Sequence, residues 1–484
     1  MNLHPLLEPG WVNAILPELI LSCGGMLLIL VEAFFPRLRA TGPLALIIVL
    51  ATMWSEVLLR GGTYFGGTYE VSAITVVFDL TFLLAATLAV LFAHDYLERE
   101  EIEGGEFYAL LMWGTVGMMM MAKGLDLLII ILGLEILSIC IFVLVGYQRK
   151  LPVSNEASLK YFLLGAFATG FILYGTALLY GATTTTNLTA MAGFFTTADA
   201  NNPLLAIAFV LIMSGFGFKL ALAPFHPWAP DVYQGAPTPV AGWLSVAPKA
   251  ATLIALVRIF WTMTPMLQQT SWMKMVAALS VLSMIVGNLV AIVQRDLKRM
   301  LAYSGIAHVG YMMIALLTIR DDGVAAVAVY TIVYALMNIG AFGVVSMLAK
   351  NQNDPQTLDD VAGLGFRRPF YGLALTICMF SLSGLPPTAG FIAKFYIFKT
   401  AIESGHIGIA LVGIVMSIVS VYYYLRVVYY LYMKEPVEGY TTSVAGVFAT
   451  GAVAISMIGI LVIGIFPKTL FDMAGTAARE LLQH

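Results

Sequence analysis

Long runs of apolar residues constrain this chain more than any other feature of its sequence. They recur along the whole length and are separated by short stretches that contain Gly, Pro and charged residues. Many are about 20 residues long, which in helical form matches the ~30 Å hydrocarbon core of a bilayer. Because hydrocarbon offers the backbone no hydrogen-bond partner, these runs are predicted to be transmembrane helices.

The composition agrees with a surface that faces lipid. Charged residues make up 11% of the 484 residues and hydrophobic residues 60%, whereas a soluble domain carries about 25% charged residues. Cys23, Cys140 and Cys378 lie in apolar runs without metal-ligand spacing, which is typical of small buried hydrophobes. The chain has no basic stripe, so nucleic acid is excluded as a partner.

The predicted fold is therefore an all-α integral membrane protein with about 14 transmembrane helices. No basic segment or A-x-A site accompanies the first run, so we interpret it as a helix of the mature protein and not as a signal peptide. The predicted spans cover residues 12–34, 43–60, 73–94, 106–122, 125–147, 159–182, 203–224, 238–262, 272–294, 299–318, 324–349, 370–399, 405–432 and 443–466.

Lysine and arginine are unequally divided between the two sets of predicted loops. With the N-terminus outside, the inner loops hold 13 of these residues, Arg37, Arg39 and Lys350 among them. The outer loops hold 7, Lys123 among them, and five lie inside helices. Because cytoplasmic loops are enriched in Lys and Arg, both termini are predicted to be extracytoplasmic.

Two parts of the sequence share the same order of features. Tyr161–Gly170 and Tyr330–Gly340 are similar, and each is followed by a further helix and then by a proline-broken one, at Ala223–Pro227 and Gly384–Pro387. The period is about 170 residues, or five helices. An odd number of helices gives the two units opposite topology, the inverted-repeat plan of transporters. The predicted divisions are an N-terminal segment 1–104, repeats 105–262 and 263–432, and a C-terminal helix and tail 433–484.

Ionisable residues lie inside the predicted spans. Each cation would cost ~2.5–3.5 kcal/mol at mid-membrane if it faced lipid, so these side chains are expected to face the bundle interior, water or a carboxylate. The cations are Lys219, Lys249, Arg258, Lys394 and Arg426, and Glu135 is the expected anionic partner of one lysine. Glu18, Glu32, Glu56 and Asp79 lie in the first three helices, where we interpret some as contacts with neighbouring subunits.

The lysines have two possible roles. One is a structural ion pair that fixes helix packing. The other is a proton relay, because a buried lysine can load and release a proton when a carboxylate partner moves. Three lysines on three helices favour the relay. Arginine does not release its proton, so Arg258 and Arg426 are assigned to structure or to lipid-headgroup contacts.

Helix breaks and histidines add to the relay hypothesis. Lys219 and Lys394 each lie within seven residues of a proline break. Backbone groups freed by a break are tolerated only in buried protein or beside water, so the breaks indicate half-channels, with a packing kink as the alternative. His226 follows the first break and His308 lies in a predicted helix. Histidine titrates near neutrality, so both are relay candidates, and a structural role is the alternative for each.

Two stretches of the sequence resemble the signatures of a known family. Residues 219–239, KLALAPFHPWAPDVYQGAPTP, and 294–310, QRDLKRMLAYSGIAHVG, are similar to those of the antiporter-like subunits of respiratory complex I. The resemblance covers essentially the whole chain. Residues 105–108, 359–369 and 383–395 look most like the N-type subunits of bacterial proton-pumping NADH:quinone oxidoreductase, since the last segment has lysine where the M type typically has glutamate.

The resemblance implies roles for particular residues. Glu135 would pair with Lys219, Lys249 would bridge the central axis, and Lys394 would be the terminal group towards the outer face. His308 would belong to the hydrophilic axis and His226 to the broken-helix loop.

The resemblance also implies a setting for the chain. NADH, FMN, iron–sulfur clusters and quinone would belong to partner subunits, because this sequence has no nucleotide or cluster motif and no metal site is expected on it. The partners would be other membrane subunits, including a neighbouring antiporter-like subunit, in the bacterial inner membrane.

Other functions stay open at this point. A subunit of a multi-subunit cation/proton antiporter, or of a related membrane-bound redox complex, shares both signatures. A secondary transporter acting alone is a different class, but few polar side chains lie near the breaks to bind a solute.

Overall fold

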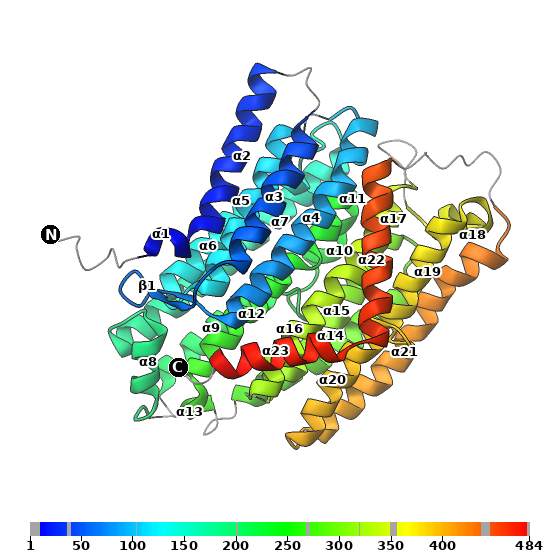
Figure 1. The fold of residues 1–484 in the computed structure, drawn as a ribbon. Helices are drawn as coiled ribbons and strands as arrows, with labels where there is room; N and C mark the ends of the chain where they lie inside the picture. The colour runs from blue at the N-terminus through cyan, green and yellow to red at the C-terminus, as the bar shows by residue number, and fades with distance from the viewer. Residues whose placement is uncertain are drawn as a thin grey trace.

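The computed structural model describes residues 10–481, except 36–39, 103, 200–201, 268–271, 319, 349–355 and 437–445. The described chain is a bundle of helices (Figure 1). Its N-terminal part contains α1 (Trp11–Ala14), α2 (Leu16–Phe34), α3 (Thr41–Val57) and α4 (Ala73–Arg99). Between α3 and α4, strands β1 (Gly62–Tyr64) and β2 (Tyr69–Val71) form an antiparallel hairpin in which Gly62 pairs with Val71.

The rest of the bundle follows the two predicted repeats. The first repeat contains α5 (Gly105–Lys123), α6 (Leu127–Val145), α7 (Pro152–Thr183), α8 (Leu188–Phe195), α9 (Pro203–Lys219), α10 (Trp228–Gly235), α11 (Thr238–Leu244) and α12 (Ala247–Thr262). After α13 (Thr264–Leu267), the second contains α14 (Trp272–Val293), α15 (Leu297–Leu316), α16 (Asp321–Tyr334), the π-helical turn η3 (Ala335–Ile339), α17 (Gly340–Ser346), the 3₁₀ turn η4 (Asp359–Val361), α18 (Leu364–Arg367), α19 (Pro369–Ser383), α20 (Ala389–Glu403) and α21 (Ile407–Met433). The chain then forms α22 (Val447–Ile465) and α23 (Lys468–Leu481).

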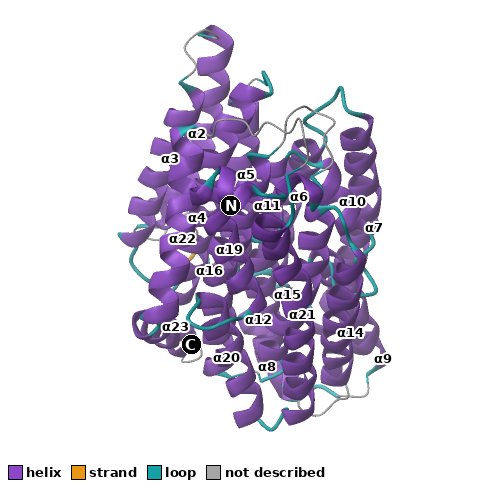
Figure 2. Cartoon of the chain, turned by 90° about the vertical axis from the view of Figure 1, so that its right-hand side faces the viewer, coloured by secondary structure: helices purple, strands orange, loops and turns teal. Residues whose placement is uncertain are grey.

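The helices have the length and composition of membrane spans. Among the described residues, nine helical segments are long and apolar enough to cross a bilayer, and three shorter helices are apolar as well. A helix of 19 residues, such as α6, extends ~29 Å at 1.5 Å per residue, close to the hydrocarbon thickness. The long helices run roughly parallel to one another (Figure 2). Each predicted span coincides with helix, which confirms the all-α membrane fold.

The structure confirms the two predicted proline breaks and shows interruptions in two other spans. The span 203–224 ends early, because α9 stops at Lys219 and Ala221 adopts a positive φ of 57° ahead of Pro224. The span 370–399 is two half-helices, α19 and α20, separated at the second proline break. The span 238–262 is interrupted between α11 and α12, and 324–349 contains the π-turn η3. The first two breaks were predicted from proline. The interruption before α12 also has a proline, Pro248 in the first turn of α12, which the prediction did not use, whereas η3 contains none.

Equivalent contacts recur in the two predicted repeats. Asp126 precedes α6 and forms an antiparallel bridge with Asn187, and Asp296 precedes α15 and forms the same bridge with Thr357. In the fifth span of each unit, an arginine donates to a carbonyl near the C-terminal end of the unit's first helix. Arg258 donates to Ala122 over 2.7 Å, and Arg426 donates to Ile292 over 2.6 Å. These contacts agree with the period of about 170 residues, while the exact divisions of the chain stay a prediction.

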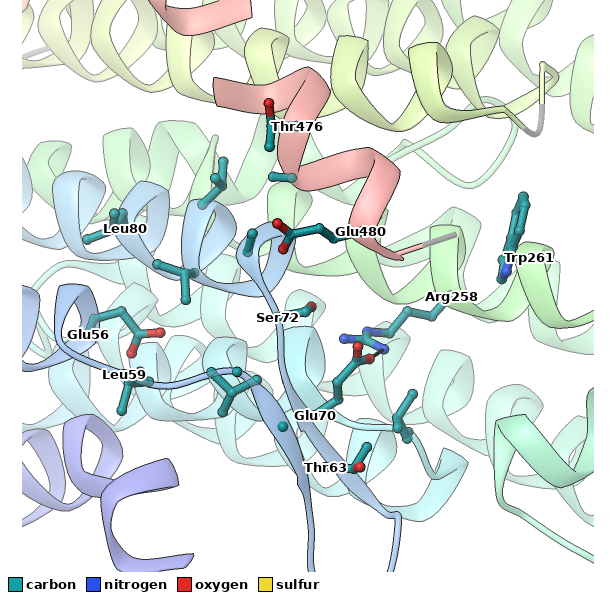
Figure 3. A pocket seen from close by; sticks show the side chains of 18 of the residues that line it. Glu56, Leu59, Thr63, Glu70, Ser72, Leu80, Arg258, Trp261, Thr476 and Glu480 are labelled. Carbon is teal, nitrogen blue, oxygen red and sulfur yellow. Dashed lines mark hydrogen bonds and ion pairs between the residues drawn. The ribbon is translucent and has the colours of Figure 1, made fainter. Parts of the chain in front are cut away.

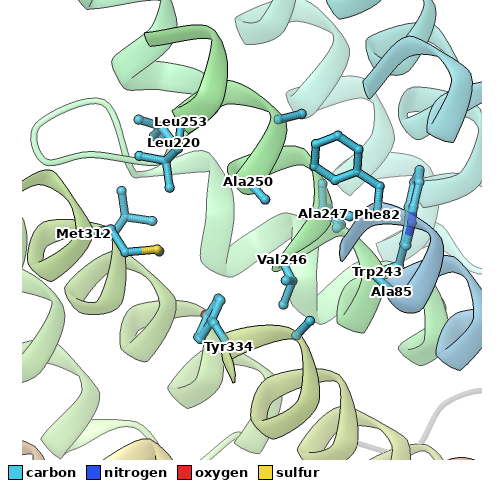
Figure 4. Close-up of a cluster of buried hydrophobic side chains, with 14 of the residues drawn as sticks. Phe82, Ala85, Leu220, Trp243, Val246, Ala247, Ala250, Leu253, Met312 and Tyr334 are labelled. Carbon is cyan, nitrogen blue, oxygen red and sulfur yellow. The ribbon is translucent and has the colours of Figure 1, made fainter. Parts of the chain in front are cut away.

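The core lies at the centre of the bundle, around α11 and α12. Figure 4 shows Phe82 of α4, Trp243 of α11, Ala250 of α12 and Met312 of α15 around one apolar cluster. All four side chains are buried. Close packing on every side of α12 fixes the position of its one lysine, Lys249.

The two ends of the bundle differ. In Figure 1, α18 lies near the upper end, and α8, α13 and the C-terminal helix α23 lie at the lower end. Helix α23 runs across the bundle, and it packs against α4 and α16 through the buried residues Ala474, Ala477 and Ala478. The predicted inner-loop cations Arg37, Arg39 and Lys350 lie outside the described residues.

Candidate functional site

Lys219 lies at the C-terminal end of α9, where the first break begins. The side chain is buried, and its Nζ donates to Ser138 Oγ of α6 over 2.6 Å. The ring of Phe142 lies 5.8 Å from the same nitrogen. A cation at a helix C-terminus is stabilised by the helix dipole, so the early end of α9 contributes to holding this charge.

Glu135 does not form the predicted direct ion pair with Lys219 in the described structure. It lies one turn before Ser138 on α6, and its carboxylate accepts a hydrogen bond of 2.7 Å from Thr169 of α7. Glu135 is half-buried and still acts electrostatically on Lys219. The two residues therefore have separate hydrogen-bond partners, Ser138 for Lys219 and Thr169 for Glu135.

Lys249 follows the interruption between α11 and α12. It is 2% exposed, and its Nζ has no hydrogen-bond partner among the described residues. The nitrogen lies over Gly305, which has no side chain. A Cβ added to Gly305 would lie 2.8 Å from Lys249 Nζ and 2.9 Å from Tyr334 Oη, so both polar atoms share the space above this glycine. The hydroxyls of Tyr334 and Tyr233 also lack a partner. Buried polar groups are nearly always satisfied, so this group of atoms is suited to hold water.

His308 of α15 lies at the centre of a hydroxyl network. Its Nδ1 is 2.7 Å from Tyr330 Oη and its Nε2 is 3.0 Å from Tyr424 Oη. Tyr424 is in turn hydrogen-bonded to Ser304. The imidazole is 1% exposed. Both ring nitrogens therefore have partners that can donate or accept a proton.

Lys394 of α20 binds the backbone freed by the second break. Its Nζ donates to the carbonyls of Leu382 and Ser383, each over 3.0 Å, and to Ser417 Oγ over 2.9 Å. The two carbonyls belong to the last turn of α19, where they have no intrahelical partner. The break thus creates the acceptors that hold the lysine of the next half-helix.

The contacts between Lys219, Lys249, His308 and Lys394 differ along the axis. His308 lies within electrostatic range of both Lys249 and Lys394, and Tyr311 contacts both His308 and Lys394, with the Lys394 nitrogen 5.2 Å from its ring. In this half of the axis the groups are close, but ring contacts and not hydrogen bonds join His308 to Lys394. Between Lys219 and Lys249 the contacts are aromatic.

The aromatic part of the axis is a stack of rings. Trp228 packs on Tyr161 at 4.4 Å between ring centroids and meets Tyr233 edge-on at 6.4 Å. The Lys249 nitrogen lies 5.7 Å from the ring of Tyr233. No polar group joins Lys219 to Lys249 among the contacts of the described residues, so a proton crossing this stretch needs water or a side-chain movement.

His226 lies apart from the axis. It is half-buried in the first break, its Nδ1 has no partner among the described residues, and its ring meets that of Tyr303 at 6.3 Å. None of its contacts reaches a relay lysine. Its place in the relay therefore stays a prediction.

The two mid-membrane arginines are structural, as one of the predicted assignments states. Arg258 forms a buried ion pair with Glu70 of β2, 2.8 Å apart. Arg426 donates to the carbonyls of Ile292 and Gln294 at the end of α14. Both fasten helix ends inside the protein.

Sequence reasoning missed one buried charged cluster. Lys123, predicted to lie in an outer loop, is fully buried at the end of α5 and forms ion pairs with Glu18, Glu56 and Asp79. These acids were interpreted as including contacts with neighbouring subunits, but they bind a lysine of their own chain. The fourth acid of that set, Glu32, accepts hydrogen bonds from the backbone of Gly104 and Gly105. Lys123 lies at the edge of an apolar run and was therefore predicted to lie in a loop. Its contacts with three acids depend on tertiary packing and have no signal in the sequence.

A helical membrane bundle with broken helices and a buried line of lysines and a histidine is the architecture of an ion-translocating membrane subunit. Comparisons with known proteins agree. The family model described as NADH:quinone oxidoreductase/Mrp antiporter, TM, matches residues 124–420. The chain belongs to this family, which confirms the resemblance seen in its signatures.

Individual relatives match almost the whole chain. An NADH-quinone oxidoreductase subunit N of Trichlorobacter lovleyi is 43% identical, over 99% of both chains. A chain of respiratory complex I from Thermus thermophilus is 35% identical, with a TM-score of 0.80 over 95% of this chain and 99% of that one. A chain of the archaeal membrane-bound sulfane sulfur reductase is 25% identical, with a TM-score of 0.86 over 97% of both.

Proposed function

We propose that this chain is the proton-translocating N-type membrane subunit of a bacterial NADH:quinone oxidoreductase. The observation that carries the proposal is the buried axis Lys249–His308–Lys394, which is continued by Lys219 and Glu135. A lysine with a purely structural role normally has a hydrogen-bond or ion-pair partner. Lys249 has neither among the described residues. A group that must gain and lose a proton fits this environment better than a structural cation does.

The relay would operate by changes in charge between neighbouring sites. Two unit charges 4 Å apart interact by ~4 kcal/mol at an effective dielectric constant of ~20. That energy shifts a proton equilibrium by about three orders of magnitude. Glu135 moving from Thr169 towards Lys219 would favour a proton on that lysine, and its return would favour transfer towards Lys249 across the aromatic stretch. From Lys249 the proton would pass by way of Tyr334 and His308 to Lys394, with water completing the path, because ring contacts and not hydrogen bonds join these groups.

The energy for this movement would come from elsewhere in the complex. NADH, FMN, iron–sulfur clusters and quinone would be bound by partner subunits, and other membrane subunits, including an antiporter-like neighbour, would contact this chain. The bacterial relatives support a place in the inner membrane. The surplus of Lys and Arg in the predicted inner loops supports termini on the extracytoplasmic side. Because the family also includes antiporter subunits, a role in a cation/proton antiporter is the alternative.

The test is the pumping of a complex that carries Lys219→Ala. We expect assembly and NADH oxidation to continue while proton transport, measured in reconstituted vesicles, falls roughly tenfold or more, because removing a proton-transfer group costs ~10²-fold or more in the step it serves. The matched control is Lys399→Ala, which removes an exposed lysine of α20 that pairs only with Glu403. Wild-type proton transport per NADH in the Lys219 variant would refute the relay.

A further inference from the structure

The cluster around Lys123 is built like a second proton site. The Lys123 nitrogen lies 2.9 Å from Glu18, 3.1 Å from Glu56 and 2.9 Å from Asp79. The three acids come from three different helices, α2, α3 and α4. Tyr69 of β2 donates a further hydrogen bond of 2.6 Å to Glu18. All five side chains are at least nine-tenths buried.

The charges in this cluster do not balance. Three carboxylates face one ammonium, so full ionisation would leave two negative charges inside the protein. Such an excess is strongly disfavoured away from water. Three of the carboxylate oxygens, Glu18 Oε2, Glu56 Oε1 and Asp79 Oδ1, also have no hydrogen-bond partner among the described residues. An additional bound cation, of which a proton is the smallest, would correct both defects.

A cavity lies beside the cluster, next to helix α23. It has a volume of about 1290 Å³, and Glu56 forms part of its wall. Figure 3 shows Glu56 on one side of this space, with Thr476 and Glu480 of α23 facing it from the other. Glu56 is therefore the member of the cluster that also forms part of the cavity wall, although its side chain is fully buried in this structure.

The other charged groups of the cavity make it acidic. Arg258 is the one cation of the lining and is paired with Glu70. Asp472 and Glu480 of α23 have no ion-pair partner among the described residues. An acidic mouth raises the local concentration of cations. The cavity thus favours delivery or removal of a positive charge at Glu56.

We propose that the Lys123 cluster, formed by Lys123, Glu18, Glu56 and Asp79, holds an exchangeable proton that enters and leaves through the cavity under α23. It would be a protonation site separate from the lysine–histidine axis. Lys249 and Arg258 lie on the same helix, α12, so the axis and the cavity share one element. Glu56 would accept a proton from the cluster, release it to water in the cavity, and regain one in the next cycle. This inference rests on the proposed function of the chain as a proton translocator.

The first test varies the pH on the cavity side alone. Whole complex is reconstituted in vesicles with the NADH-oxidising part outside, which by the predicted topology places α23 in the lumen. The initial rate of charge transfer is read with a voltage-sensitive dye at several lumen pH values. For wild type we expect a dependence of up to about tenfold per pH unit, the slope of one titrating group. Glu56→Gln should flatten this dependence, and Glu403→Gln, an exposed acid of α20, should leave it unchanged.

A second variant keeps the test valid if Glu56→Gln prevents assembly. Thr476 is exposed and lines the cavity from α23, so Thr476→Trp narrows the opening without touching the cluster. We expect slower charge transfer with the same number of protons per NADH. Wild-type rates and wild-type lumen-pH dependence in Thr476→Trp, or an unchanged profile in an assembled Glu56→Gln complex, would overturn the proposal.

Two further measurements separate the possible causes of failure. If wild-type rates follow lumen sodium concentration at constant pH, and Glu56→Gln abolishes that dependence, the cluster binds sodium and the proton assignment is wrong. Lys219→Ala reports on the relay independently. Lost pumping in that variant, together with a wild-type profile in Glu56→Gln, would leave the relay intact and reject only the cluster.

Discussion

At the scale of single residues, the three axis lysines differ in what holds their charge. Lys394 has three hydrogen-bond acceptors, Lys219 has one hydroxyl, and Lys249 has none among the described residues. Hydrogen bonds to a charged form stabilise it. The Lys249 ammonium is therefore the least stabilised by hydrogen bonds, which suits the proposed bridging role of Lys249, whereas a proton leaving Lys394 must break a hydrogen bond to one of three acceptors.

Glu135 is expected to act through its charge. Glu135→Gln should reduce proton transport roughly tenfold, because it removes the charge that acts on Lys219 and leaves only a hydrogen-bond partner for Thr169. Glu135→Asp keeps the charge on a shorter side chain and should lose less. Proton transport and quinone-coupled NADH oxidation in vesicles measure both variants. Equal activities of the two would show that charge is not the operative property.

Lys394 is expected to need its proton as well as its charge. Lys394→Arg keeps the charge but does not release the proton, and its planar group fits poorly among the acceptors around Lys394. We predict a loss of proton transport of roughly tenfold. Lys394→Glu should retain part of the function, since a carboxylate can also carry a proton.

Proton uptake by inverted vesicles, normalised to assembled complex, gives the comparison for these Lys394 variants. Lys399→Arg, on the same helix but exposed, is the control. Full transport by Lys394→Arg would mean that static charge is sufficient at this position.

At the scale of elements, the functional side chains lie beside interrupted helices. Lys219 ends α9, Lys249 follows the junction of α11 and α12, and Lys394 fills the gap between α19 and α20. Tyr334, which shares the space over Gly305 with Lys249, immediately precedes the π-turn η3. Interruptions are tolerated in a membrane only where other groups satisfy the freed backbone, so they mark the places where a polar side chain is stable.

Gly384 tests this arrangement. It ends α19 with φ of 84°, and an added Cβ would lie 2.9 Å from Lys394 Cδ. Gly384→Ala should destabilise the complex by about 1–2 kcal/mol from backbone strain alone and should also reduce proton transport by displacing Lys394. Gly408→Ala is the control, because Gly408 is helical with open space around it. Thermal unfolding of purified complex and vesicle transport are the readouts; equal behaviour of the two variants would contradict the prediction.

At the scale of the whole molecule, the outer surface of the bundle is strongly apolar. Many large apolar residues are exposed on α2, α7 and α21, a surface suited to lipid and to neighbouring membrane subunits. Among the described residues, no group of three or more His, Cys, Asp and Glu side chains is placed to hold a metal ion.

The purified chain should not oxidise NADH. We predict a rate indistinguishable from that of protein-free detergent when NADH and a soluble quinone are supplied, because the sequence has no nucleotide-binding motif. The intact complex, purified from the same cells, is the positive control. Quinone-dependent NADH oxidation by the chain free of other subunits would overturn the assignment to a translocating subunit.

The sequence by itself determined the membrane fold, the positions of its spans, both proline breaks and the lysines of the axis. These follow from local properties: span length is set by bilayer thickness, breaks by proline, and mid-membrane charge by its solvation cost. Only the tertiary structure decided which side chains meet. It gave Lys219 a hydrogen bond to Ser138 in place of Glu135, left Lys249 without a hydrogen-bond partner among the described residues, and gathered Glu18, Glu56 and Asp79 around Lys123. Such contacts join residues far apart in the chain, and their geometry depends on how whole helices pack, which no local pattern of residues records.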